Sequence, residues 1–355
     1  MNNEKEMESP DLLATVGIIT RTKDRPVLLK RAFESVVNQS YDDWHLVIVN
    51  DGGDPAAVDR LVNHYAPQLR DRITVIHNPA SLGMEAASNK GIRSVKTRYL
   101  AIHDDDDSWA PEFLTIAVAE IEHIRGKFPQ VAGVITLANT IYERVVGNLV
   151  TIDRTEPYWT SDKRGFVMLN EVLAENQFAP IQFLFSYDAA ESIGFFRADL
   201  PVLGDWDFNI RFMSRYDIFI IPQFLAFYHH RITDQSGYGN SIHAGRSQHE
   251  LYAKMLKNEW LRKDLQNQQF GVGALIAMQQ TARSAAQTTQ PQPQPQPIAS
   301  SNFVRLRRIG KLVMLWMSSD QKLSILKKFC RVLLSEGAGS ALRQIKTWYI
   351  SRGGR

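Results

Sequence analysis

The chain has 355 residues, of which 44% are hydrophobic and 22% are charged, and this composition is that of an ordinary globular protein with room for one large domain and an appendage. The single cysteine excludes an intrachain disulfide and argues against a cysteine-based zinc site. The N-terminal residues carry no signal-peptide pattern, and no apolar run approaches the roughly 18 residues that span a bilayer, so we expect a cytoplasmic protein.

The net charge of +3 is distributed unevenly along the chain. Residues 298–355 contain twelve Lys or Arg and two acidic residues, so they carry +10, and the preceding residues carry −7. An acidic body is therefore followed by a basic tail, which the average over the whole chain conceals.

Four short apolar runs rich in β-forming residues predict buried strands: 15–20, 44–50, 73–77 and 98–103. Between them, apolar residues recur at helical spacing, as in 28–37 and 58–65. Strands that alternate with helices predict βαβ units and a parallel sheet, which places this chain in the α/β class.

Three polar motifs follow these strands: TRTKDRP after the first, NDGGD after the second and HDDDDSW after the fourth. In parallel sheets, ligands bind at the carboxyl ends of the strands. One such motif is compatible with a simple turn, but three at one edge of a sheet predict a binding site.

The second half of the body continues with a predicted helix over 112–127 and a strand that begins at 131 and runs into a hairpin whose turn lies near VGN. A helix around 166–175 follows. The segment from 180 onward then predicts a strand, a helix, a loop and a second helix that begins near Asp205.

The Gln/Pro-rich residues 286–300 predict a semi-rigid linker, because alternating proline favours polyproline II. This divides the chain into a flexible N-terminus (1–11), a large domain (12–285), the linker, and a basic amphipathic helical tail (301–355). The tail fits an anionic membrane surface, and a small helical bundle packed on the body or on a partner is an equal alternative. No aromatic ladder or recognised module in the tail supports a nucleic-acid partner.

Four consecutive aspartates, Asp104 to Asp107, are electrostatically unfavourable, because adjacent carboxylates repel each other. A solvated acidic loop is one reading, and a cation site is the other. In an extended segment, Asp104 and Asp106 would face one pocket while Asp105 and Asp107 face away or cap the next helix. The run lacks the glycine and glutamate of a calcium-binding hand, so an open site for Mg²⁺ or Mn²⁺ with substrate phosphates is the better match.

With these motifs together, residues from about Val16 to Arg231 resemble the family 2 glycosyltransferases of the GT-A fold, the inverting family that builds bacterial surface polysaccharides. The resemblance rests on five segments in the family's order: VGIITRTKDRP, FESVVNQSYDDWHLVIVNDGG, SLGMEAASNKGI, YLAIHDDDDSWAPEFL and SIGFFRADLPVLGDWDFNIR. It implies a nucleotide-sugar donor, a divalent metal and a hydroxyl acceptor.

The resemblance also implies roles for single residues. The implied donor contacts are Thr22 and Asp51 at the nucleoside, Asn89, Asp104 at the ribose or a metal-bound water, and Asp106 at the metal that bridges the phosphates. Asp205 would be the general base, with Asp207 as its nearest rival, and His229 would be a third metal ligand or a diphosphate contact. Two structural readings stay open: NDGG as an ordinary Asx turn around Asp51, and Asp205 as a helix N-cap.

Two positions depart from the family pattern. Ser88 stands where the family commonly has Arg, so the cation near the phosphates is unassigned, with Lys90 and Arg93 as candidates. Gly204 stands where the family often has Glu before the base. The polar, glycine-marked segment 227–241 is predicted to be a mobile loop closing over the site.

The sequence thus predicts a metal-dependent inverting glycosyltransferase, with a UDP-sugar as favoured donor and a lipid-linked or growing surface glycan as acceptor. The tail would hold the enzyme at the inner face of the cytoplasmic membrane. The alternatives are a sugar nucleotidyltransferase, which would want a glycine-rich loop after the first strand, and a non-catalytic membrane adaptor.

Overall fold

The computed structural model describes residues 12–69, 71–147, 149–158, 164–231 and 246–289. The chain divides into two compact units, Met1–Ser284 and Ala285–Arg355. The predicted flexible N-terminus, most of the linker and the whole basic tail lie outside the described residues.

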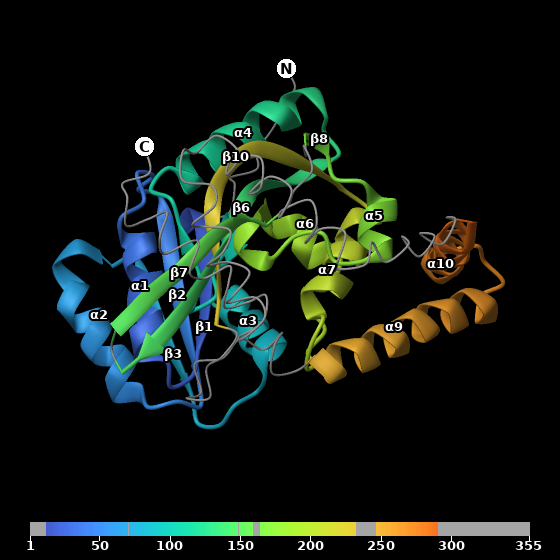
Figure 1. Ribbon diagram of the computed structural model, residues 1–355. Coiled ribbons are helices and arrows are strands. Elements are labelled where there is room, and N and C mark those ends of the chain that lie inside the picture. Colours follow the sequence, from blue (N-terminus) through green and yellow to red (C-terminus); the bar gives the residue numbers. More distant parts are fainter. Residues whose placement is uncertain (1–11, 70, 148, 159–163, 232–245, 290–355) are drawn as a thin grey trace, which may run out of the picture. The chain divides into compact units, whose positions relative to one another are not determined.

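The first half of the larger unit is a parallel sheet with helical connections (Figure 1). Its strands are β1 (Ala14–Thr22), β2 (Trp44–Asp51), β3 (Ile73–Asn78) and β4 (Thr97–Ile102), in the spatial order β3-β2-β1-β4. Its connecting helices are α1 (Pro26–Val37), α2 (Pro55–Leu69) and α3 (Met84–Arg93). The four strands and the parallel pairing predicted from the sequence are confirmed.

Strands β1, β2 and β4 are covered on both faces of the sheet. A strand buried on both faces requires a nearly continuous run of apolar residues, and the sequence supplies such a run for each of the three. Every residue of β2 is buried. Helix α1 begins with Pro26, which suits the first helical turn, and it turns the side chains of Leu28, Leu29 and Phe33 into the core.

The second half extends the same sheet with mixed pairing. Strand β9 (Phe183–Ser186) pairs antiparallel with both β4 and β6 (Val131–Val146), and β10 (Asp217–His230) runs parallel to β6. The remaining strands are β5 (Ser108–Trp109), β7 (Leu149–Pro157) and β8 (Gly165–Phe166), so that the described residues form one ten-stranded sheet. The hairpin predicted after residue 131 is confirmed as β6–β7.

One predicted loop is wrong in part, since residues 227–230 are the end of β10 and lie opposite 139–142 of β6. Their aromatic side chains pack in the sheet, where Tyr158 meets Tyr228 edge to face. The rest of that predicted loop from residue 232 to its end at 241 lies outside the described residues.

The remaining helices cover the sheet or follow it: α4 (Phe113–Lys127), α5 (Leu169–Ala174), the 3₁₀ turn η1 (Pro180–Gln182), α6 (Tyr187–Ser192), α7 (Gly204–Met213), α9 (Arg246–Gln266) and α10 (Val272–Thr289). Two apolar clusters form the core, one containing Phe185, Phe208 and Trp206, the other Trp44, Phe33 and Phe113. Helix α10 extends into the predicted linker, whose prolines begin only at Pro291. No helix among the described residues has the length and apolarity that crossing a membrane requires.

Candidate active site

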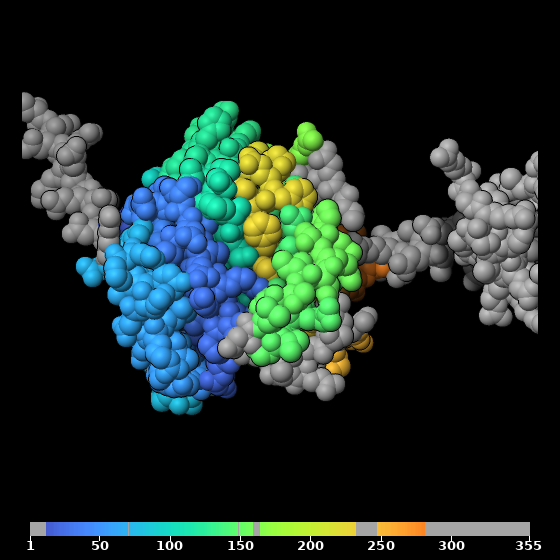
Figure 2. All heavy atoms as spheres, turned by 60° about the vertical axis from the view of Figure 1, so that its left-hand side comes forward, coloured from blue at the N-terminus to red at the C-terminus, as the bar shows by residue number. Residues whose placement is uncertain are grey.

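The three polar motifs meet at one edge of the sheet, as predicted. Thr22 of β1 lies opposite Asn50 of β2, and Ile19 of β1 lies opposite Ile102, the last residue of β4. The hairpin β6–β7 also reaches this region, because Arg31 of α1 donates to Glu143 of β6 at 2.6 Å. Figure 2 shows residues of the hairpin (green) beside residues of the first part of the described chain (dark blue), with residues of the later chain (yellow) above them.

The acid run is a turn, so the prediction of an extended segment is wrong. The N–H of Asp107 donates to the carbonyl oxygen of Asp104 at 3.2 Å. The prediction that Asp107 caps the next helix is also wrong, because its carboxyl accepts from the backbone N–H of His229 at 2.9 Å. The turn lets successive carboxyl groups point in different directions, so each accepts hydrogen bonds from a different set of donors.

These partners are mainly arginines. Arg21 donates to Asp104, and Arg25 pairs with Asp105 and, at 3.3 Å, with Asp106. Arg231, which is almost fully buried, also donates to Asp106. The run is therefore neither a solvated loop nor a set of free carboxylates, since Asp105, Asp106 and Asp107 are all buried and held by basic or backbone donors.

Glu143 is the centre of this network, and the sequence analysis missed it. Its carboxylate accepts from Arg31 at 2.6 Å and from Arg231 at 2.7 Å, and it contacts the Nδ1 of His229 at 2.8 Å. Burial opposes ionisation, but the hydrogen bonds from His229 and Arg31 outweigh it and lower the pKa of Glu143 to about 2. An acidic residue inside the mainly apolar strand 131–146 was the available signal.

The neighbouring aspartates differ in their proton affinity. Burial raises the pKa of Asp105 to about 6 against the opposing charge of Arg25. Burial also opposes ionisation of Asp106, but Arg25 and Arg231 outweigh it and lower the pKa of Asp106. Burial and the charge of Asp106 raise the pKa of Asp107. Of Asp105, Asp106 and Asp107, Asp106 is therefore the one held most firmly as an anion.

The predicted metal ligands divide into two groups. The ring nitrogens of His229 are engaged by Glu143 and by Ser108, the latter at 2.9 Å. No group of three or more His, Cys, Asp or Glu is arranged to hold a metal ion within the described ranges. Asp104 and Asp106, however, each receive their hydrogen bonds from described residues on a single carboxylate oxygen.

The chemistry of Asp104 and Asp106 fits Mg²⁺ or Mn²⁺. Mg²⁺ is commonly bound through one or two carboxylates, with waters and substrate phosphates completing the octahedron. The second oxygens of Asp104 and Asp106 are hard donors of this type, and Asp104 is partly open to solvent. These two residues, without His229, are those that would hold the ion.

Asp205 lies at the start of α7, where the sequence predicted a helix to begin. The N-cap residue is Leu203, so Asp205 is not the N-cap. Its Oδ1 instead accepts the N–H of Trp206 at 2.8 Å, and its Oδ2 accepts from Asn176 at 2.6 Å. Burial, with a further contribution from the charge of Asp104, raises the pKa of Asp205 in spite of these hydrogen bonds.

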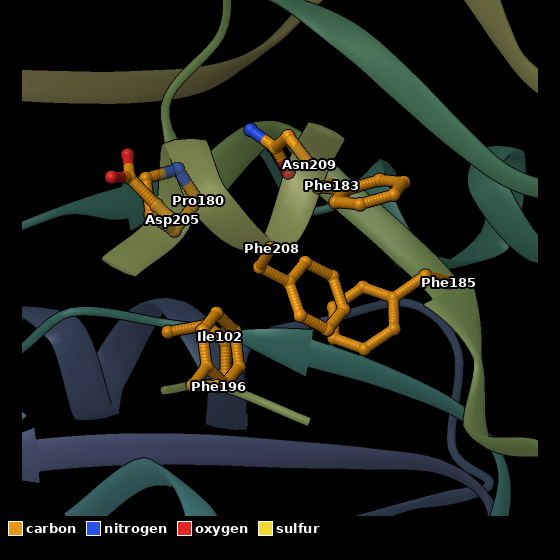
Figure 3. Close-up of a pocket in the computed structure, with 8 residues that line it drawn as sticks. All are labelled: Ile102, Pro180, Phe183, Phe185, Phe196, Asp205, Phe208 and Asn209. Carbon is orange, nitrogen blue, oxygen red and sulfur yellow. The ribbon is translucent and has the colours of Figure 1, made fainter. Parts of the chain in front are cut away.

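A small apolar pocket adjoins Asp205 (Figure 3). The carboxyl group points away from the rings of Phe185 and Phe208 that help to line the pocket. Its rival, Asp207, is buried and bonded to Arg211 at 2.7 Å, with Arg197 at 3.8 Å. Asp207 therefore serves α7 itself, while Asp205 is partly exposed.

The other predicted donor contacts have structural partners. Thr22 donates to Asp105 at 2.7 Å. Asn89 brackets the backbone of Phe196, donating to its carbonyl oxygen at 2.7 Å and accepting its N–H at 3.1 Å. Lys90 donates to Asn78 and Arg93 lies over the ring of Phe195, so neither supplies the cation at the acid run.

Asp51 also holds a local structure. Its carboxylate accepts from Asn78, from Ser81 and from the backbone N–H groups of Leu82 and Gly83, at 2.7 to 3.0 Å. The predicted Asx turn is present, although its side chain is Asn50, whose Oδ1 accepts the N–H of Gly53. Asp51 thus fixes the loop that leads into α3.

The fold is mixed α/β and contains a Rossmann-like parallel half-sheet. An acid run follows the fourth strand of this half-sheet, and a separate carboxyl group lies on a later helix. This arrangement is of the GT-A type. Residues 16–148 match the model of Glycosyl transferase family 2. The chain therefore carries a domain of this enzyme family.

Similar proteins agree with this assignment. WcaA of Escherichia coli, named for colanic acid biosynthesis, is 34% identical over 31% of this chain and 38% of its own length. ExoW of Rhizobium meliloti, a succinoglycan biosynthesis protein, is 33% identical over 27% of this chain and 30% of its own length. The chain thus matches about a third of these relatives. The structure of Staphylococcus aureus TarS 1–349 shares the fold, with a TM-score of 0.50 at 14% identity over 61% of this chain and 60% of TarS 1–349.

Proposed function

We propose that the chain is a metal-dependent inverting glycosyltransferase. It would move a sugar from a nucleotide-diphosphate sugar, with a UDP-sugar as favoured donor, to a hydroxyl of a lipid-linked or growing surface glycan. The preference for UDP comes from the family resemblance at Asp51.

The observation that carries the proposal is the relation between Asp205 and the acid run. Asp205 comes from α7 and Asp104 from the end of β4, yet the charge of Asp104 contributes to the raised pKa of Asp205. Arg21, bonded to Asp104, also interacts electrostatically with Asp205. A donor held at the acid run therefore presents its sugar near a carboxyl group of increased basicity.

The chain's own residues account for the proton and for orientation. Asp205 would accept the proton of the acceptor hydroxyl as that oxygen attacks the anomeric carbon, and the carbon–oxygen bond to the diphosphate breaks. A single base on the face opposite the leaving group gives inversion. Asn176 and the N–H of Trp206 hold the two oxygens of Asp205, so the carboxyl group has a fixed direction.

The acid run would hold the donor's diphosphate through a divalent ion on Asp104 and Asp106. When bound, the ion supplies Lewis-acid neutralisation of the negative charge that develops on the leaving diphosphate. Arg25, which pairs with Asp105 and Asp106, keeps these carboxyl groups in place.

A thermal-shift panel with UDP, GDP, dTDP and CMP, each with Mn²⁺ or with EDTA, tests donor binding. A ligand that binds only the folded state raises its melting temperature, so we expect a shift for one nucleotide that requires the metal. No shift with any nucleotide would favour a non-catalytic adaptor.

Asp205→Asn tests the base. We expect donor turnover to fall roughly 100-fold or more while the nucleotide shift is retained, because the amide cannot accept the proton. Asp188→Asn, an exposed aspartate in the first turn of α6, is the matched control and should keep full activity. Retained turnover in Asp205→Asn would contradict the assignment.

A further inference from the structure

Gly204, the residue before the proposed base, lies directly against a carboxyl side chain from another helix. A Cβ atom at position 204 would come within 2.3 Å of the Cδ of Glu85, which belongs to the first turn of α3. The backbone of Gly204 is not in the left-handed region, so the obstacle to a larger residue is the Glu85 side chain rather than backbone strain. Glu85 is buried.

The guanidinium of Arg21 occupies the adjoining space. Arg21 is the second-last residue of β1, and its NH1 group donates to the hydroxyl of Ser88 at 2.9 Å. The same NH1 lies 3.9 Å from the Oε2 of Glu85, and NH2 donates to Asp104. Both side chains are largely shielded from solvent, with exposed fractions of 11% for Arg21 and 6% for Glu85.

The pair thus lies between the two functional carboxyl groups. Arg21 contacts Asp104 on the donor side and interacts electrostatically with Asp205. Glu85 packs under the residue that precedes Asp205.

We propose that Arg21 and Glu85 form a buried pair that positions the base Asp205 relative to Asp104, and that Ser88 and Gly204 are small because this pair fills the space beside them. The proposal rests on the proposed glycosyltransferase function. Arg21 and Glu85 are positioning residues: they act through Asp104 and Asp205.

A physical argument supports an effect on turnover rather than on donor affinity. Burial raises the pKa of Glu85 to about 7 against the opposing charge of Arg21, so its carboxylate is the negative partner of Arg21 above that pH. Without this partner, the guanidinium of Arg21 would be drawn fully to Asp104 and Asp205, which are both acidic. The start of α7 would also lose the side chain on which Gly204 rests. A displacement of about 1 Å at a reacting group is enough to lower a rate roughly 100-fold.

The kinetic test, run at about pH 8 where the Glu85 carboxyl group is ionised, is Glu85→Gln, which keeps the volume and removes the charge. The readout is hydrolysis of the sugar nucleotide that the wild-type chain cleaves. We expect kcat to fall about tenfold or more with KM for the donor within about twofold. Glu156→Gln, in an exposed pair with Arg154, is the control and should leave both constants unchanged. An unchanged kcat in Glu85→Gln would overturn the proposal while leaving the proposed function intact.

The packing of the pair has a test that needs no substrate. Gly204→Ala should lower Tm by roughly 3 to 10 °C, because the new methyl group overlaps Glu85. Adding Glu85→Ala should restore most of that loss, since the obstructing side chain is then absent. Equal Tm losses from Gly204→Ala with and without Glu85 would overturn the proposal. A wild-type chain that binds no nucleotide and cleaves no donor would instead contradict the proposed function.

Discussion

Asn176 determines the direction and the proton affinity of the proposed base. Its amide donates to Asp205 at 2.6 Å and its oxygen accepts from Asn209 at 3.1 Å. Because a donated hydrogen bond stabilises the ionised carboxylate, its loss in Asn176→Ala raises the pKa of Asp205 further. We expect the acid limb of the pH–rate profile to move to higher pH, with roughly tenfold lower turnover at neutral pH and partial recovery above it.

The control for this profile is Asn63→Ala, an exposed change on α2. A uniform loss of activity at every pH would show that Asn176 is only a packing residue.

We expect the substitution Glu143→Gln to lower the free energy of unfolding strongly. This substitution leaves Arg31, Arg231 and His229 around a neutral group in a buried site. Breaking a buried charge network at one partner costs about 3 to 5 kcal/mol, so the unfolding free energy from urea titration should fall by that order. The exposed Glu156→Gln should change it by less than about 0.5 kcal/mol, and a similar small change at Glu143 would contradict the network's importance.

At the scale of elements, Asp51 ties the end of β2 to the loop before α3. Burial opposes its ionisation, but the donors Leu82, Ser81, Asn78 and Gly83 outweigh burial and lower its pKa below 3.8. A lowered pKa contributes stability that is present above pH 3.8 and is lost as the pH falls through the folded-state value. The wild-type chain should therefore be more stable than Asp51→Asn from pH 7 to about 5, and the difference should shrink below about pH 4.

Unfolding in urea at several pH values measures this difference. A gap that grows on acidification would have the wrong sign and would exclude Asp51 as the anchor.

The sequence predicted the elements where the pattern is periodic and local. The four parallel strands, α4 and the β6–β7 hairpin follow from apolar runs and turn residues. The end of β10 was missed because residues 227–230, which are Phe, Tyr, His and His, form no periodic pattern. Their place in the sheet depends on pairing with β6. Arg231, which pairs with Asp106, and Glu143, which pairs with Arg231, were missed for the same reason, since both are distant in sequence from Asp106.

At the scale of the whole molecule, charge is segregated along the chain. The body carries −7 and residues 298–355 carry +10. The arginines around the acid run are matched by carboxylates, as Arg25, Arg31 and Arg231 are. The segregation of charge along the chain can be predicted from composition alone. The pairing of each arginine with its carboxylate can be seen only in the fold.

The basic tail predicts an interaction with anionic lipid, which would bring the site to a lipid-linked acceptor. Each Lys or Arg near an anionic surface contributes about 1 kcal/mol, so twelve such residues allow strong, salt-sensitive binding. We expect the full chain to sediment with phosphatidylglycerol vesicles at 0.1 M salt, to be released at about 0.5 M salt, and to leave phosphatidylcholine vesicles unbound. A variant in which the Lys and Arg of 301–355 are changed to Gln should lose sedimentation. Equal binding to both lipids, or none to either, would instead favour a tail that packs on protein.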